Sequence, residues 1–255
     1  PPRSTLFPYT TLFRSAPLNY WGPGFAMRGD DVVTVTMSTT GNVQRQSLVQ
    51  SAGAGEPREI ASVSRELVPL DLPGMSMPAP RIFAPDLIWT SAGDTVLVLN
   101  GPEYRIDIYA DGHRIGSVRR DQDPIVVTGE LAAARVGSGP YRGFMRRTGV
   151  TAERMVAAIG YEELASPIEW IAGAPSGELW VSRGTGLPVP DRVDVFAPDG
   201  RYLGTLDAPG FPVAFLSDSI FVALEITEYG EPVLGLYGLE REDERDKDGI
   251  AHPGT

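Results

Sequence analysis

The sequence contains no cysteine and only two histidines among its 255 residues. The absence of cysteine excludes disulfides and thiolate metal sites, and it is compatible with any redox compartment. The histidines, His113 and His252, are far apart in the chain, so they do not predict a multi-histidine metal centre. Carboxylate cages are the metal sites that remain, and we expect no cofactor.

Long apolar runs and clustered basic residues are also missing. No run approaches the roughly 20 apolar residues that span a bilayer. Acidic residues outnumber basic ones by 33 to 22, which gives a net charge of −11. A surface this acidic argues against nucleic acid or an anionic membrane as the binding partner, because phosphate binding needs clustered lysine and arginine. The partner that remains is an unidentified protein or small-molecule ligand.

Known catalytic motifs are absent as well. The sequence has no nucleophile elbow of the Gly-x-Ser-x-Gly type, no P-loop and no dinucleotide-binding glycine motif. What it does contain is a repeat, clearest in Asp94–Arg119. This stretch predicts three short strands, Thr95–Leu99, Tyr104–Tyr109 and Arg114–Val118. Between the last two lies Ala110-Asp111-Gly112, a tight-turn signal, because glycine adopts positive φ without steric cost.

A second copy of the repeat covers Gly177–Leu206. Arg192–Phe196 matches Arg105–Tyr109, and an Asp-Gly turn again precedes the last strand. Trp89 and Trp170 occupy equivalent positions, each on a short strand ahead of its copy. Each copy therefore reads as a four-stranded antiparallel meander of about 40 residues, the length of one propeller blade.

Two weaker copies begin at Gly29 and Asp218. The pattern, fullest in Asp191–Gly200, resembles that of NHL-type six-bladed β-propeller proteins over about residues 20–240. The family's usual Asp-x-x-Asn lead-in is not intact at Asn100–Glu103. The resemblance implies a propeller fold and favours a periplasmic or secreted location. It fixes no activity, because the family includes ligand-binding scaffolds, interaction modules and some enzymes.

The ends of the chain differ from its body. Leu6–Ser15 resembles the translation of a sequencing adapter, so we interpret residues 1–15 as an artefact and expect upstream sequence to be missing. Residues 16–240 are interpreted as the partial propeller. Residues 241–255 carry a mixed-charge run and are expected to be a disordered tail.

Two segments inside the body break the strand pattern. Residues 121–166 are alanine-rich and lack alternation, which predicts a helical insertion between blades; a degenerate fifth blade is the alternative. We expect a helix over Val150–Ala165, capped by Thr151, lying across the face that carries the long loops. Its arginines should lie near the acidic loops. Glu66–Pro85 holds five prolines, which predict an extended connector and exclude a central strand.

The predicted fold class is all-β: a β-propeller of four-stranded antiparallel meander blades, forming an incomplete ring with a helical insertion. Once the insertion is set aside, residues 16–240 accommodate about four blades. An open arc leaves the first and last blades without neighbours, and we expect both to present apolar faces. The protein should therefore be poorly soluble or oligomeric.

Function is expected on the face that carries the long loops, because binding residues concentrate on loops held by a rigid scaffold. We predict a non-catalytic scaffold that binds a protein or small ligand there. The candidate binding residues are Glu103, Arg183, Asp191, Glu225 and Glu228. The alternative is a metal-assisted hydrolase or lyase that uses the channel carboxylates Asp86 and Glu169. Arg105 and Arg192 begin equivalent strands and are expected to join neighbouring blades.

Overall fold

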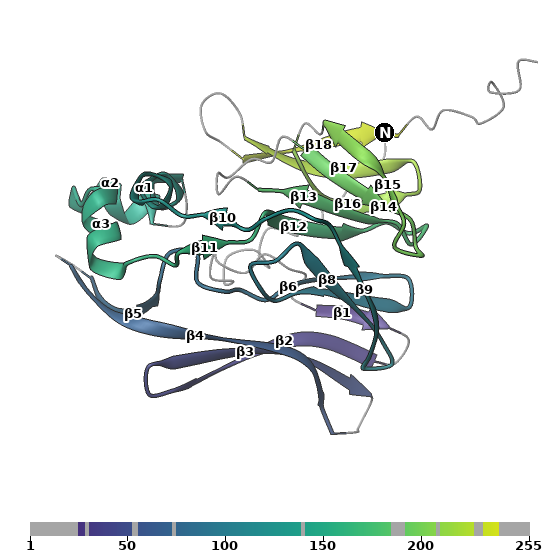
Figure 1. Cartoon of the computed structure of the whole chain (residues 1–255), viewed down its shortest axis with the longest axis horizontal. Helices are drawn as coiled ribbons and strands as arrows, with labels where there is room; N and C mark the ends of the chain where they lie inside the picture. Colours follow the sequence, from purple (N-terminus) through teal and green to yellow (C-terminus); the bar gives the residue numbers. More distant parts are fainter. Residues whose placement is uncertain are drawn as a thin grey trace, which may run out of the picture.

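The structure is a computed structural model that describes residues 25–28, 31–52, 56–72, 75–138, 141–184, 192–207, 210–226 and 232–239. Within these ranges the chain forms four antiparallel sheets, a two-stranded ribbon and three helices. The four sheets stack in chain order, and the first and last lie at opposite ends of the stack (Figure 1). The stack is thus an open arc, as expected for an incomplete propeller-like ring.

The first sheet is the largest and differs most from a regular blade. Its strands follow one another in the order β1-β2-β3-β4-β5. One face buries Val33 and Leu48 against Trp89 of the next sheet. The strand bounds are β1 (Phe25–Arg28), β2 (Asp31–Thr40), β3 (Val43–Ala52), β4 (Arg58–Leu72) and β5 (Met75–Pro80).

The proline-rich segment is not the extended connector that its composition predicts. The second half of β4 pairs with β5 as a hairpin, in which Pro69 lies opposite Pro78. The prolines are tolerated because each half of β4 has one neighbour: β3 pairs with Arg58–Glu66 and β5 with Leu67–Leu72. Both prolines therefore lie on strands with a free edge, where proline costs no ladder bond.

The second and third sheets confirm the predicted meander blades. Each has four strands in sequential antiparallel order. At the turn between the last two strands of the second sheet, Asp111 and Gly112 both have positive φ, 50° and 70°, as a type I′ hairpin requires. The bounds are β6 (Ile88–Ala92), β7 (Thr95–Leu99), β8 (Arg105–Ala110) and β9 (His113–Arg119), then β12 (Ile168–Gly173), β13 (Leu179–Arg183), β14 (Arg192–Phe196) and β15 (Tyr202–Asp207).

The fourth sheet has three described strands, β16 (Phe211–Ser217), β17 (Ile220–Ile226) and β18 (Pro232–Gly238). The first strands of the last three sheets, β6, β12 and β16, are neighbours, as innermost propeller strands are. At Gly173 a side chain is excluded, because a Cβ there would lie 2.4 Å from the Ser91 carbonyl oxygen. This close approach sets the spacing between the two innermost strands.

A buried carboxylate joins the second and third sheets. Asp194 on β14 is fully buried and accepts hydrogen bonds from Tyr104 (2.8 Å) and Arg120 (2.6 Å) of the preceding blade. The expectation for Arg105 is wrong: it binds Asp107 on its own strand (2.9 Å). Arg120 lies in the connector after β9, so it can reach the next blade, whereas Arg105 lies at the start of β8.

The insertion is helical, as predicted, with bounds α1 (Gly129–Ser138), α2 (Arg142–Thr148) and α3 (Ala152–Ile159). The Thr151 hydroxyl accepts from the Arg154 amide at 3.3 Å and caps α3. The expected helix over Val150–Ala165 is too long, because α3 ends at Gly160 with φ of 73°. The chain then forms the ribbon of β11 (Leu164–Ala165) with β10 (Ile125–Val126).

The helices pack on the β4–β5 hairpin at one end of the molecule (Figure 1). Leu70, Leu72 and Ala79 of the hairpin share a core with Val136, Met155 and Ile159 of the helices. The exposed arginines do not meet acidic loops as expected: among the described residues none of them pairs with a carboxylate. They are Arg142, Arg146, Arg147 and Arg154. No helix in the described ranges is long and apolar enough to cross a membrane.

Candidate functional site

Two carboxylates lie at the same end of neighbouring innermost strands. Asp86 directly precedes the stretch that leads into β6, and Glu169 is the second residue of β12. Each is at the opposite end of its strand from the short turns at Ser91–Gly93 and Pro175–Gly177. Both therefore lie on the side of the molecule that carries the long loops and the helical insertion.

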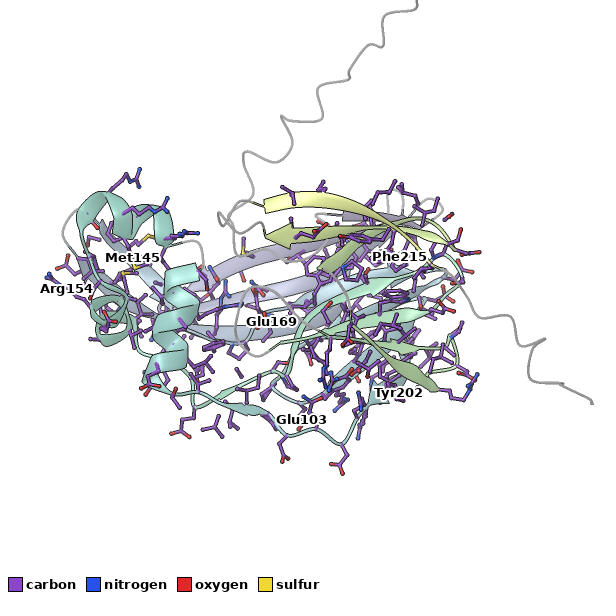
Figure 2. All side chains as sticks on the ribbon, turned by 90° about the horizontal axis from the view of Figure 1, so that it is seen from above. Glu103, Met145, Arg154, Glu169, Tyr202 and Phe215 are labelled. Atoms are coloured by element: carbon purple, nitrogen blue, oxygen red, sulfur yellow. The ribbon has the colours of Figure 1, made fainter. Side chains whose placement is uncertain are left out.

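Glu169 binds an arginine of the insertion. Its Oε2 accepts from Nη1 of Arg135, on α1, at 3.2 Å, and Figure 2 shows Glu169 between the helices and the sheets. Gly184 makes room for the Glu169 side chain, because a Cβ at that position would lie 1.9 Å from Glu169 Cγ. The end of β13 thus allows the carboxylate to reach the helix.

Asp86 binds an arginine of the first sheet. Its Oδ1 lies 3.4 Å from Nη1 of Arg65, on β4, and also accepts from the Leu87 amide at 3.2 Å. Burial raises the pKa of the Asp86 carboxyl, although Arg65 and, less strongly, Arg135 oppose that rise. Asp86 and Glu169 therefore both lie in the field of Arg135.

The backbone beside these ion pairs has an unusual conformation. Phe83 has φ of 62°, in the left-handed region that bulky residues rarely adopt. Its ring lies under the guanidinium of Arg135, 5.7 Å from the ring centroid to Cζ. A conformation of this kind costs about 1–3 kcal/mol and clusters at functional sites. It marks the segment between β5 and β6 as a candidate part of a site.

We call Arg65, Asp86, Arg135 and Glu169 the axial cluster. Its four charges come from β4, the β5–β6 connector, α1 and β12, and they sum to zero. Both ion-pair distances exceed 3 Å, so neither pair is a tight bidentate contact. A ligand with an anionic group and hydrogen-bond donors can therefore exchange with either half of each pair.

In the described part of the chain, no third carboxylate joins Asp86 and Glu169. Among the residues that the structure describes, no group of three histidine, cysteine, aspartate or glutamate side chains is placed to hold a metal ion. The acidic pair faces arginines instead. The arrangement therefore has the chemistry of a polar recognition site, in which burial raises the pKa of the Asp86 carboxyl.

The candidate residues named from the sequence do not form one group in the described part of the chain. Glu103 is exposed on the β7–β8 loop, away from Glu169 in Figure 2. Arg183 ends β13, where its Nε lies 3.5 Å from Asp194. Glu225 lies within β17 and accepts from the Tyr237 hydroxyl at 2.6 Å. Asp191 and Glu228 lie outside the described residues.

Sequence reasoning identified the two carboxylates and missed their partners. Arg65 lies on β4, and the sequence predicts a connector from Glu66 onward, where β4 in fact continues to Leu72. Arg135 lies on a helix whose packing depends on the β4–β5 hairpin. A usable signal exists on β3, where Gln44 and Gln46 alternate on the inward face. Gln44 accepts from Arg65 at 2.8 Å, and Gln46 accepts from the Leu87 amide at 2.9 Å.

A groove lies elsewhere, between the second and third sheets near their short turns. It has a volume of about 310 Å³ and is lined by Ile108, Val118 and Leu179 with the turn residues Pro198 and Gly200. Its one charged lining residue, Asp199, is exposed. It brings together fewer charged groups than the axial cluster, which is why the cluster is the better candidate site.

No protein-family model matches the sequence, and no curated protein is similar to it in sequence. Among solved structures, the chain is similar at 13% identity to a protein described as a candidate 6-phosphogluconolactonase from Bacteroides fragilis. The match covers 82% of this chain and 67% of that one, with a TM-score of 0.29.

The chain is also similar to the AfRom2 CNH domain, at 10% identity and a TM-score of 0.25. That match covers 84% of this chain and 62% of the other, so the chain spans less than two thirds of its length. Similarity at this level supports no inference about activity. The fold is established by the chain's own sheets, which make it all-β and propeller-like, with meander blades in an open arc.

Proposed function

We propose that the protein is a non-catalytic propeller scaffold that binds a small polar ligand through the side carrying its long loops, at the axial cluster. The observation that carries the proposal is that two carboxylates at the same end of neighbouring blades each pair with an arginine from another segment. Glu169 pairs with Arg135 of the helical insertion, and Asp86 pairs with Arg65 of the first sheet. Phe83, with its positive φ, forms one wall beside them.

The chemistry of the cluster defines the ligand class. Arg65 and Arg135 offer planar sets of N–H donors that suit a carboxylate or phosphate. Asp86 and Glu169 offer acceptors for hydroxyl or amine groups. A ligand that carries both kinds of group, such as a hydroxy acid, matches all four residues without leaving a buried charge unpaired.

A binding experiment tests the proposal. We expect a panel of hydroxy acids, amino acids and phosphorylated sugars to contain compounds that raise the melting temperature of the protein. Arg135→Ala should weaken their binding by about 10–100-fold, since hydrogen bonds to charged groups contribute roughly 1.5–3 kcal/mol.

Arg154→Ala is the matched control, because Arg154 is an exposed arginine of the same insertion that points away from the sheets (Figure 2). It should bind every compound as the unaltered protein does. Equal binding by both variants, or no stabilising compound in the panel, would contradict the proposal. Circular dichroism of the free variants separates a loss of binding from a loss of fold.

The second candidate function is a metal-assisted hydrolase or lyase that uses Asp86 and Glu169. The raised pKa of Asp86 favours it, because a general acid must hold its proton near the working pH. This candidate predicts turnover of lactone or ester substrates with added divalent cation, abolished by Asp86→Asn. Ligand binding without turnover separates it from the preferred function.

We further propose that the chain is part of an NHL-type six-bladed propeller protein that works outside the cytoplasm. The repeated Arg-x-Asp-x-aromatic segment on β8 and β14, followed by an Asp-Gly turn, supports this assignment. The sequence of the complete gene tests it: two further copies of the repeat and an export signal are expected.

A further inference from the structure

Arg183, the last residue of β13, is a largely buried cation whose hydrogen-bond donors are unused. Its side chain is 21% exposed, and its Nε is buried without a hydrogen-bond partner. Asp194 lies 3.5 Å from this Nε, close enough for an ion pair, but the N–H makes no hydrogen bond to it. A buried donor without an acceptor is costly, so a charged group in this state calls for a further partner.

The carboxylate of Asp194 is already held by three other donors. Its Oδ2 accepts from the Tyr104 hydroxyl at 2.8 Å and from Nη1 of Arg120 at 2.6 Å. Its Oδ1 accepts from the Thr205 hydroxyl at 2.5 Å. These bonds fix the buried carboxylate in place, and Arg183 lies beside it without joining them.

The arginines around Asp194 therefore leave one positive charge uncompensated. Arg120 and Arg183 pair with different oxygens of the same carboxylate. Among the residues that the structure describes, neither arginine pairs with another carboxylate. Burial, followed by the bond to Asp194, raises the pKa of the Tyr104 hydroxyl, so this group adds no negative charge. Two arginines and one aspartate then sum to +1, in a protein whose net charge is −11.

Both guanidiniums reach the surface from the side that carries the long loops. Arg120 follows the end of β9, and Arg183 lies at the end of β13, so both enter the interface between the second and third sheets from that side. Arg120 is 30% exposed and lies over the ring of Tyr202, 4.5 Å from its centroid. In Figure 2, Tyr202 lies beyond Glu169 as seen from the helices. The group shares no residue with the axial cluster.

We propose that Arg120 and Arg183 form a second binding site, which takes the carboxylate group of a small acid. A carboxylate brings the single negative charge that the group lacks. The planar N–H sets of the two guanidiniums match its two oxygens. A phosphate group fits less well, because its charge of about −2 exceeds the local charge and Asp194 repels the surplus.

Acetate binding by the full chain tests the proposal. In chloride buffer of constant ionic strength, titration calorimetry should show that acetate binds and that it binds more tightly than inorganic phosphate. Arg183→Gln should weaken acetate binding by about 10–100-fold, since hydrogen bonds to charged groups are lost. Arg201→Gln is the matched control and should bind as the unaltered protein does, because Arg201 is an exposed arginine at the short-turn end of the same blade.

A second variant separates binding from folding. Arg183→Lys keeps a positive charge beside Asp194 but loses the planar N–H set, so it should retain the fold by circular dichroism and still bind acetate more weakly. No binding of acetate, equal binding by both Arg183 variants, or tighter binding of phosphate would each overturn the proposal.

The NMR signal of the Arg183 Nε–H group reports on this site alone. The signal is assigned by its absence from Arg183→Gln, and acetate should shift it. In Arg135→Ala, which removes an arginine of the axial cluster, acetate should shift it to the same extent. The result is therefore separate from the outcome at the axial cluster. A signal that does not move with acetate would also contradict the proposal.

Discussion

Asp107 and Asp194 occupy the same position in two copies of the repeat, yet they are held in different ways. Asp194 accepts from Tyr104 and Arg120 of the preceding blade and from Thr205 of its own. For Asp107, the preceding sheet is the enlarged first sheet. The two arginines that bind Asp107, Arg105 and Arg114, come from its own blade.

The difference shows that the contribution of a repeated aspartate to stability depends on the sheet that precedes its blade. Asp194 is fully buried, and its partners cross a sheet interface. Asp107 is almost as buried, but its partners Arg105 and Arg114 belong to its own blade and are 33% and 42% exposed, against 30% for Arg120. Only Asp194 should therefore stabilise the contact between blades, and substitutions can test that distinction.

The largest effect is expected for Asp194→Ala. The substitution removes the acceptor of the buried Tyr104 hydroxyl and of the Arg120 guanidinium, which is 30% exposed. It should therefore cost more than the loss of one such bond, about 3 kcal/mol of unfolding free energy. Urea denaturation measures the loss. Asp207→Ala, on the exposed end of β15, is the control and should change stability by less than about 0.5 kcal/mol. Similar values for the two variants would contradict the role given to Asp194.

Tyr104→Phe isolates the hydrogen bond that crosses the interface. Burial, followed by the bond to Asp194, raises the pKa of the Tyr104 hydroxyl, so it stays a neutral donor throughout the neutral pH range. Loss of a bond to a charged acceptor should cost about 1.5–3 kcal/mol. Tyr109→Phe, in the same blade, should cost less. A double-mutant cycle between Tyr104 and Asp194 should give a coupling energy; additive effects would show that they do not interact.

Asp107→Ala should have a smaller effect, about 1 kcal/mol, because Arg105 and Arg114 can turn to water when they lose their partner. Added salt should reduce this difference, since these ion pairs are partly exposed. Denaturation of the variant at low and high salt provides the measurement. A loss as large as that of Asp194→Ala, independent of salt, would remove the distinction between the two aspartates.

Asp86→Asn should have the smallest effect, and it concerns pH. A raised pKa means that the folded protein holds the Asp86 proton more strongly than the unfolded chain does. Asp86 therefore contributes stability below its ordinary value of 3.8, and this contribution is lost as pH rises through the raised pKa. In Asp86→Asn the melting temperature should decline less over that window. An unchanged pH profile would contradict the assignment.

The sequence predicted the repeated blades because their signals are local. The β-branched, apolar run after Gly93-Asp94 predicted β7 residue for residue, and the Asp111-Gly112 pair predicted the hairpin turn with its positive φ values. The helical insertion followed from the missing alternation and from the Thr151 cap. These elements depend on neighbours along the chain, so they can be read without knowledge of the tertiary structure.

The parts that were missed depend on contacts between distant segments. The prolines of β4 and β5 are acceptable because these strands lie at a sheet edge there, which composition does not reveal. The meeting of Arg135 with Glu169 requires α1 to fold back over β12. For the same reason, Asp86 and Glu169 could be placed on innermost strands, whereas their arginine partners could not be named.

The core shared by the helices and the β4–β5 hairpin also makes the insertion depend on a distant segment of the chain. Blade β6–β9 lies between these two segments in the sequence, so the chain must loop it out before Leu72 can meet Met155. Closing so long a loop has an entropic cost, and isolated helices shorter than about 12–15 residues are marginal in water. Residues 121–166 are therefore not an independent folding unit. A transplant of the insertion into another scaffold would have to include the hairpin on which its helices rest.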